Sequence, residues 1–412
     1  MATFRKYNPA TDRTAVQRIW REVAWMEDKP EQRQAFDLLL QTSRALVAEV
    51  NGEAECLVLS MPGTIRYLGE TLSFDAVTGV TTSRVARKQG FAGQLTARLV
   101  AAGAEEGVLV TGLGIFEQGY YDQLGFGSGN YEHWLAFDPA QLHIHRQHRV
   151  PRRLTTDDWK AIHASRLARQ HGHGTVDLLP PEATRAEMIW GKEAFGLGYF
   201  DGPAGELTHH LWFTGGDKGR GPYVVGWLSY QTTEQFLELL ALIKSLGDQV
   251  RLVRMREPHG IQLQDFLRQP FRFRQLTEKS KYENRMSASA YWQVRMNDIP
   301  ACLAQTHLRG ETVRFNLCLA DPIERYLPAD ASWRGVTGEY VITLGAKSEA
   351  VLGSEATLPT LTASVNAFTR LWLGTRPATG LAVTTDLAGP PELLEQLDMA
   401  FCLPSPKTDW DF

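Results

Sequence analysis

Residues 79–127 read GVTTSRVARKQGFAGQLTARLVAAGAEEGVLVTGLGIFEQGYYDQLGFG and decide the fold of this chain. A β-rich run ends near Thr82, a basic turn containing Gly90 follows, and then a helix begins. The helix is indicated by apolar residues that recur on one face, namely Phe91, Leu95 and Leu99. The stretch therefore predicts a strand, an anion-binding turn and a helix in series.

The turn has the chemistry of a phosphate site. Free backbone N–H groups at a helix start favour a pyrophosphate, and Arg87 and Lys88 add positive charge beside them. A P-loop requires Gly-x-x-x-x-Gly-Lys-Ser/Thr and a dinucleotide fold requires Gly-x-Gly-x-x-Gly; neither motif is present. The spacing Arg87-x-x-Gly90-x-Ala92 instead resembles the acetyl-CoA signature of the GNAT N-acetyltransferases, Gln/Arg-x-x-Gly-x-Gly/Ala.

Two further segments resemble one branch of that family. Tyr121-Asp-Gln-Leu-Gly-Phe-Gly127 is similar to the Tyr-x-x-hydrophobic-Gly-aromatic-Gly element of the enhanced intracellular survival (Eis) branch, in which the tyrosine is the proposed general acid. The register of this element selects Tyr121 over its neighbour Tyr120. The chain also ends Pro404-Ser-Pro-Lys-Thr-Asp-Trp-Asp-Phe412, similar to an ending whose terminal carboxylate is the proposed general base. One departure is Arg84, which stands where many members have proline.

The resemblance implies an acetyl-CoA site and two catalytic groups. Tyr121 is the expected acid and the carboxylate of Phe412 the expected base. Strand backbone around Val80 is expected to hold the cofactor's amide arm and to support charge on the carbonyl oxygen. The expected cofactor-binding residues are Val80, Thr81, Thr82, Arg87, Lys88, Gln89, Gly90, Phe91, Ala92, Gly93, Phe116 and Glu117.

Composition narrows the other possibilities. The 412 residues suit two or three domains, and 43% hydrophobic residues suffice for sizeable cores. A net charge of −4, from 43 basic and 47 acidic residues, argues against a nucleic-acid partner. No apolar run approaches the roughly 20 residues of a membrane helix, and a cytoplasmic location is expected. The cysteines are scattered along the sequence, and we expect them to be small core residues: Cys56, Cys302, Cys318 and Cys402.

We predict three domains in the order of the resemblance, with an α/β and α+β fold class. Residues 1–140 form the GNAT domain with the acetyl-CoA site. Residues 141–285 form a degenerate second GNAT fold, because Gln231 to Gln235 offers neither glycine nor positive charge where pyrophosphate would sit. Residues 286–412 resemble a sterol carrier protein type-2-like domain, with strands around 313–319 and 338–344 and an apolar helix about 361–373.

Other candidate sites receive plainer interpretations. His143, His145 and His148 lie among arginines that would repel a cation, so we interpret them as part of a basic linker and expect no metal. Trp25, with Glu27 and Asp28 after it, offers an acidic and aromatic lining for an amine pocket, but we favour the interpretation of these residues as solvated loop charges.

The predicted function is acetyl transfer from acetyl-CoA to an amine by direct attack in a ternary complex. Aminoglycosides, polyamines, other small amines and protein lysines are all open as acceptors, and the resemblance implies a homo-oligomer such as a hexamer. The alternative is a binding or regulatory protein with a decayed transferase site and a hydrophobic ligand in its last domain.

Overall fold

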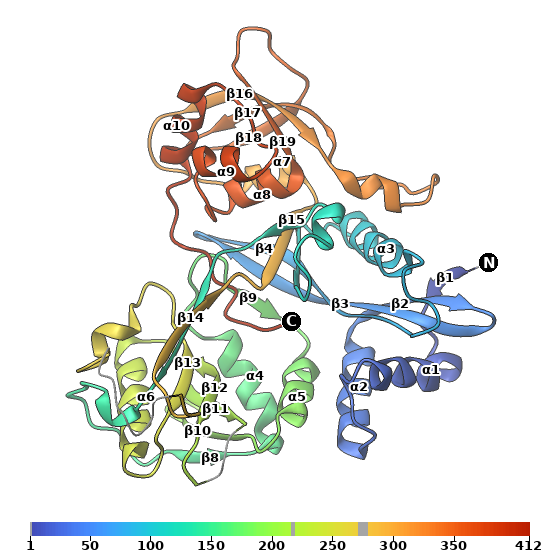
Figure 1. The fold of residues 1–412 in the computed structure, drawn as a ribbon. Coiled ribbons are helices and arrows are strands. Elements are labelled where there is room, and N and C mark those ends of the chain that lie inside the picture. The colour runs from blue at the N-terminus through green and yellow to red at the C-terminus, as the bar shows by residue number, and fades with distance from the viewer. Residues whose placement is uncertain (1, 216–218, 271–278) are drawn as a thin grey trace.

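A computed structural model describes residues 2–215, 219–270 and 279–412. The chain forms three units, each built around its own β-sheet, with the C-terminus lying between the first two units (Figure 1). The sheets have eight, seven and four strands. Within the described residues, no helix combines the length and the apolar character needed to cross a membrane.

The first unit contains the eight-stranded sheet. Its helices are α1 (Pro9–Glu22) and α2 (Pro30–Thr42) on one face and α3 (Phe91–Glu105) on the other (Figure 1). Asn51 and Gly52 both have positive φ and turn the chain between two strands, as the hairpin signal predicts. The strands of this part of the chain are β1 (Thr3–Lys6), β2 (Arg44–Val50), β3 (Glu53–Tyr67), β4 (Glu70–Thr82), β5 (Val110–Gly114) and β6 (Gly127–Ser128).

Strand β4, helix α3 and strand β5 form the predicted strand–turn–helix–strand series. The two strands are parallel, and their pairing runs only from Phe74 opposite Val110 to Val77 opposite Leu113. Beyond Val77 the strands diverge, so residues 78–82 keep one edge that β5 does not cover. A ligand that offers amide groups can pair with such an edge in the manner of an added strand.

The second unit repeats this series in β12 (Tyr223–Ser229), α6 (Thr233–Ser245) and β13 (Val253–Arg256). Strands β12 and β13 are also parallel and also pair over a short distance, from Tyr223 to Val224. The other helices of this unit are α4 (Trp159–Leu167) and α5 (Pro181–Trp190). Its other strands are β7 (Glu132–Phe137), β8 (Arg152–Leu154), β10 (Phe195–Tyr199), β11 (His209–Thr214) and β14 (Arg285–Ser289), while β9 (Val176–Leu178) pairs with β3 of the first sheet.

The third unit has the four-stranded sheet in the order β18-β17-β16-β19. Its elements are β16 (Val313–Ala320), β17 (Gly338–Leu344), β18 (Glu349–Leu352), β19 (Thr360–Ser364), α7 (Ile299–Ala304), α8 (Val365–Trp372), α9 (Ala378–Thr384) and α10 (Pro391–Ala400). The prediction of a helix over 361–373 is therefore wrong for its first turn, residues 361–364. Residues up to Ser364 pair with β16, and the Ser364 side chain then caps α8 by accepting from the N–H of Ala367.

Two segments pass from one sheet to another. Residues 127–128 pair in the first sheet, whereas β7 (Glu132–Phe137) pairs in the second. In the same way β14 pairs in the second sheet, and β15 (Trp292–Met296) returns to the first sheet beside β5. These crossings lie near the predicted domain boundaries at residues 140 and 285. The division into domains itself stays a prediction.

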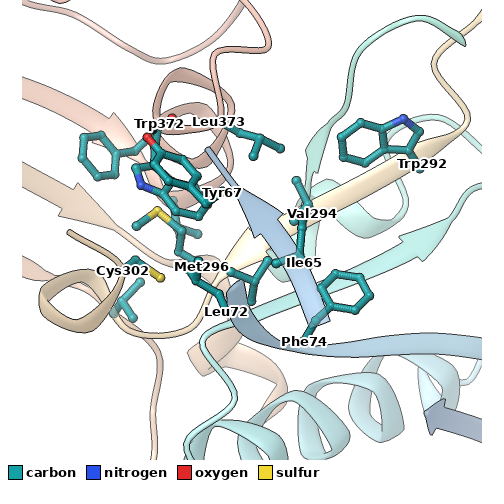
Figure 2. Packing of buried hydrophobic residues seen from close by; sticks show 14 of the residues in the cluster. Ile65, Tyr67, Leu72, Phe74, Trp292, Val294, Met296, Cys302, Trp372 and Leu373 are labelled. Carbon is teal, nitrogen blue, oxygen red and sulfur yellow. Dashed lines mark hydrogen bonds between the residues drawn. The ribbon is translucent and has the colours of Figure 1, made fainter. Parts of the chain in front are cut away.

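The third unit packs on the first through an aromatic stack. The rings of Tyr67 and Trp372 lie 4.3 Å apart and nearly parallel, and both side chains are buried (Figure 2). The Tyr67 hydroxyl donates to the backbone oxygen of Trp372 at 2.9 Å, and Trp372 Nε1 donates to Thr306 Oγ1 at 2.9 Å. His173 of the second unit accepts from the Leu68 N–H on its Nδ1 and places Nε2 3.0 Å from the Leu373 oxygen. All three units therefore meet at this point.

The stack generates a stability prediction. Trp372→Ala removes a buried indole at the junction and leaves a cavity, so we expect a loss of about 3–5 kcal/mol, measured by chemical denaturation. The control is Met399→Ala, because Met399 is largely exposed on α10 and should change stability by less than about 0.5 kcal/mol. Equal denaturation midpoints for the two variants would contradict the role assigned to the stack.

Candidate active site

A bulge bends the strand β4 where it leaves β5. Pairing with β3 shifts between Leu57 and Leu59, which leaves one extra residue on the β4 side, and Gly79 there has φ +62°. A Cβ at Gly79 would lie 2.9 Å from Leu59 Cδ1 and 3.1 Å from Trp20 Cζ2. Glycine is required both by the left-handed backbone and by this close packing. The bulge turns the backbone around Val80 toward the open edge of the strand.

The start of α3 is an uncapped helix N-terminus. Its N-cap is Gly90 with φ +77°, and no side chain caps the helix. Lys88 also has positive φ, so the turn alternates between right- and left-handed backbone and can present several N–H groups to one anion. Arg87, Lys88 and Gln89 are exposed beside this turn. The geometry and charge fit a pyrophosphate.

The corresponding start of α6 is closed by its own side chains. Thr232 Oγ1 accepts from the Gln235 N–H, and Gln235 Oε1 accepts from the backbone N–H groups of Gln231 and Thr232. The space between the diverging strands β12 and β13 is a cavity of only about 60 Å³, lined in part by Arg169, Arg256 and Asp409. In the described residues, this copy of the βαβ series thus differs from the first in its capped helix start and in the small space between its strands.

A cavity of about 530 Å³ opens at the divergence of β4 and β5. Val80, Phe116, Tyr121 and Phe412 all line it, although they come from distant parts of the sequence. The first and second units supply its remaining walls, together with the end of the chain. The structure thus brings the expected acid, the strand backbone and the chain end to one space.

Tyr121 begins a short 3₁₀ turn, η1 (Tyr121–Leu124), and its side chain is only 8% exposed. Its ring packs against Tyr120 and Phe126 in edge-on contacts. Among the described residues no group hydrogen bonds to its hydroxyl. Burial raises the pKa of Tyr121, with smaller contributions from Tyr120 and Cys56, so the phenol stays protonated at neutral pH. A neutral O–H that lines the cavity can donate to a ligand there.

The last six residues are held along the second unit. Lys407 Nζ donates to the oxygens of Glu257 and Pro258, and the Thr408 oxygen accepts from the Val176 N–H at 2.8 Å. Asp409 accepts from Arg169 Nε at 3.0 Å, and Trp410 is buried. These contacts fix the path of the chain before its end.

Phe412 closes the cavity at the end of that path. Its ring packs edge-on against Phe74 with the centroids 5.5 Å apart. Its backbone oxygen lies beside Gly114, 3.1 Å from the position that a Cβ there would take. The Phe412 backbone oxygen therefore lies next to the end of β5, and Tyr121 lines the same cavity.

The other expected residues lie in three places. The side chains of Thr81 and Thr82 make contacts inside the sheet. Thr81 Oγ1 donates to the Gly79 oxygen, and Thr82 Oγ1 contacts Cys56 Sγ. Only the backbone of these two residues therefore faces the open edge. Glu117 is exposed. The remaining expected residues lie in the first turn of α3: Phe91, Ala92 and Gly93, of which Gly93 packs against Tyr326.

The three candidates for the amine pocket lie in different surroundings. Trp25 lines the cavity and stacks on Phe116 with centroids 5.3 Å apart. Glu27 instead pairs with Lys29 and Lys192, and Asp28 pairs with Arg21 and Arg33. The interpretation of the two acids as loop charges agrees with these pairs. In the histidine-rich linker, the rings of His143 and His145 lie 4.5 Å apart, and the described residues contain no cluster of metal-ligating side chains.

Sequence reasoning missed most of the cavity wall. The missed residues are Trp20, Leu39, Met61, Ala183, Ala186, Glu187, Trp190, Tyr291 and Asp411. Trp20 belongs to an apolar helical stripe, and its pattern is that of any core residue. Glu187 and Trp190 come from α5 of the second unit, and only the packing of α5 on α2 brings them here.

Comparison with known proteins agrees with this geometry. Residues 3–129 match a family model described as an acetyltransferase (GNAT) domain. A comparison with curated protein sequences finds no significant match.

Solved structures resemble the chain over its whole length. Eis1 from Mycobacterium abscessus has a TM-score of 0.74 at 16% identity, with 100% of both chains covered. A probable N-acyltransferase from Enterococcus faecalis V583 has a TM-score of 0.77 at 18% identity, again over 100% of both chains. A GCN5-related N-acetyltransferase from Kribbella flavida has a TM-score of 0.73 at 17% identity, covering 100% of this chain and 99% of that one. At these identities the likeness shows a shared fold.

The chain therefore contains a GNAT acetyltransferase domain within a mixed α/β fold of several sheets. Its full-length fold is that of Eis1 and other N-acyltransferases, in agreement with the resemblance to the Eis branch. The domain match supports the prediction of an acetyltransferase enzyme.

The contrast between the two βαβ series predicts one cofactor per chain. Gly90→Val places a β-branched side chain at positive φ on the open helix start, so we expect CoA affinity to fall about tenfold or more in calorimetry. Thr232→Val is the matched control on α6. It should cost about 1 kcal/mol of stability through the lost cap while CoA affinity stays the same. Two CoA molecules bound per chain would contradict the prediction.

Proposed function

We propose that this protein is an acetyl-CoA-dependent N-acetyltransferase that acts by direct transfer to an amine. The observation that carries the proposal is that Val80, Tyr121 and Phe412 line one cavity where β4 and β5 diverge, while the uncapped start of α3 follows β4 in the chain. The α3 start and the basic pair Arg87 and Lys88 bind the pyrophosphate, and the free edge of β4 holds the pantetheine amides. Proteins with the GNAT domain use acetyl-CoA, which is consistent with this assignment.

Each catalytic group then has one task. The carboxylate of Phe412 takes a proton from the acceptor's ammonium group, and the backbone N–H at Val80 supports charge on the carbonyl oxygen. Tyr121 donates its hydroxyl proton to the departing sulfur and is restored by the second proton that the nitrogen loses. Acetyl-CoA, when bound, supplies a thioester whose C–S bond breaks as the C–N bond to the amine forms. The products are an amide, free CoA and one proton.

The finer architecture belongs to the same proposal. The second unit is a GNAT fold without a cofactor, which its parallel β12–β13 pair and its capped α6 support. The third unit is sterol carrier protein type-2-like, and the protein works as a cytoplasmic homo-oligomer.

The alternative function is that of a binding or regulatory protein whose transferase site has decayed. Arg84 departs from the family pattern and here donates toward Glu22. The open helix start and the buried, uncommitted hydroxyl of Tyr121 favour the active enzyme over this alternative.

Tyr121→Phe tests the acid. Removing the hydroxyl should lower kcat about 10²-fold, the usual scale for a positioned proton donor, while calorimetric CoA affinity is unchanged. Tyr120→Phe is the matched control one residue away and should keep near-normal turnover. If Tyr120→Phe lost the activity and Tyr121→Phe kept it, the acid would be misassigned.

Two variants test the carboxylate of Phe412. Appending one alanine after Phe412 keeps the ring and turns the carboxylate into a neutral amide, so acetyl transfer should fall about 10²-fold with CoA binding intact. Gly114→Val should lower acetyl transfer to a similar degree without any change at the C-terminus, because the valine side chain would occupy the place of the carboxylate oxygen. Normal turnover of the extended protein would exclude this carboxylate as the base.

A further inference from the structure

The two acidic side chains that line the cavity among the described residues, Glu187 and Asp411, each pair with an arginine, and the Arg256 that pairs with Asp411 also pairs with buried Glu132 at 3.1 Å. Glu187 accepts from Arg166 Nη1 at 2.7 Å on one oxygen and from Trp410 Nε1 at 2.8 Å on the other. Asp411 accepts from Arg256 Nη2 at 2.6 Å and from the Tyr291 hydroxyl. Each acid that lines the cavity thus has a cation as its direct partner.

These ion pairs are fixed parts of the wall. The side chains of Arg166 and Arg256 are 4% and 12% exposed, and the Arg166 guanidinium stacks 3.6 Å from the centre of the Trp410 ring. Asp411 keeps 62% of its side-chain surface accessible and lines the cavity. Desolvation raises the pKa of Asp411, yet the charge of Arg256 and the Tyr291 hydrogen bond outweigh it and leave the pKa lowered. The acid stays ionised and bound to its arginine.

Aromatic rings make up the rest of this side. Trp20 contacts Trp25 edge-on and Trp190 at a tilt, with both centroid distances 5.4 Å, and Phe116 extends the wall beyond Trp25. Leu39 and Met61 also line the cavity. The Trp20 ring is 5% exposed, and its Nε1 has no acceptor among the described residues. A flat apolar group suits such a wall.

Among the carboxylates that line the cavity in the described part of the chain, only that of the chain end lies outside the ion pairs. Among the ion pairs of the described residues, none involves the terminal carboxylate that Phe412 carries in this chain. It can accept one ammonium group. A second ammonium on the same ligand would have to leave water for a place beside Arg166 or Arg256, where no free anion compensates it.

We infer that the acceptor is an arylalkyl primary monoamine, with its ring among Trp20, Trp25 and Trp190 and its single ammonium at the chain end. This inference rests on the proposed acetyl transfer and names the class of amine that the same site takes. A polycation such as a polyamine or an aminoglycoside matches the cavity poorly in both charge and polarity.

The experiment measures thiol release from acetyl-CoA with phenethylamine, tryptamine, spermidine and kanamycin, using the full chain. We expect kcat/KM for the better arylalkylamine to exceed that for either polycation at least about tenfold, which corresponds to roughly 1.4 kcal/mol. A polycation preferred by that factor would overturn the inference and leave the transferase function standing. No thiol release with any amine, from protein that binds CoA, would overturn the proposed function and the inference together.

A pair of tryptophan variants tests the aromatic wall. Trp25→Ala should raise KM for the arylalkylamine about tenfold while CoA affinity and the KM for spermidine change little. Trp159→Ala is the matched control, because Trp159 is partly buried on α4 and does not line the cavity. An unchanged arylalkylamine KM in Trp25→Ala, from protein that still binds CoA, would count against the assigned wall.

Discussion

The stack of Tyr67 on Trp372 is the contact on which the candidate site depends. It joins the β3–β4 hairpin of the first unit to α8 of the third, and His173 of the second unit bonds to the chain on both sides of the stack. From Trp372 the chain makes two more helices and then returns along the second unit to Phe412. The end of the chain reaches the cavity of the first unit only because both ends of this return path are anchored. A change that weakens the stack is therefore expected to disturb the geometry of the candidate site as well.

The two βαβ series show how few residues separate a cofactor site from a structural element. Both have parallel strands that pair briefly and then diverge. At α3 the cap is a glycine with no side chain, so the helix dipole and its N–H groups stay available. At α6 Thr232 and Gln235 satisfy the same groups internally, and arginines with Asp409 fill the space between the strands. The second series thus has a capped helix start and a place for the tail where the first series has an open helix start.

The sequence predicts the local parts of this structure well. The Arg87 to Ala92 spacing and the turn around Gly90 specify a helix start, because caps and turns depend on neighbouring residues. It does not predict the exchange of β7 and β15 between sheets, because strand pairing partners are set by the whole fold. Residues 361–364 resemble a helix start in composition, but pairing with β16 makes them a strand. Glu187 and Trp190 reach the cavity only through packing between units, and no local pattern marks them.

The ion pairs of the cavity wall explain why its carboxylates should not be counted as binding charge. An ionised acid beside an apolar cavity needs a partner, because burying it alone would cost several kcal/mol. Arg256 and Arg166 supply that partner to Asp411 and Glu187, and the same contacts fix Trp410 and the last turn of the chain. The acids next to Phe412 thus serve mainly to hold the tail in place. The charge that remains for a ligand is set by the pairs as a whole, and an acidic composition at the chain end does not by itself indicate a site for polycations.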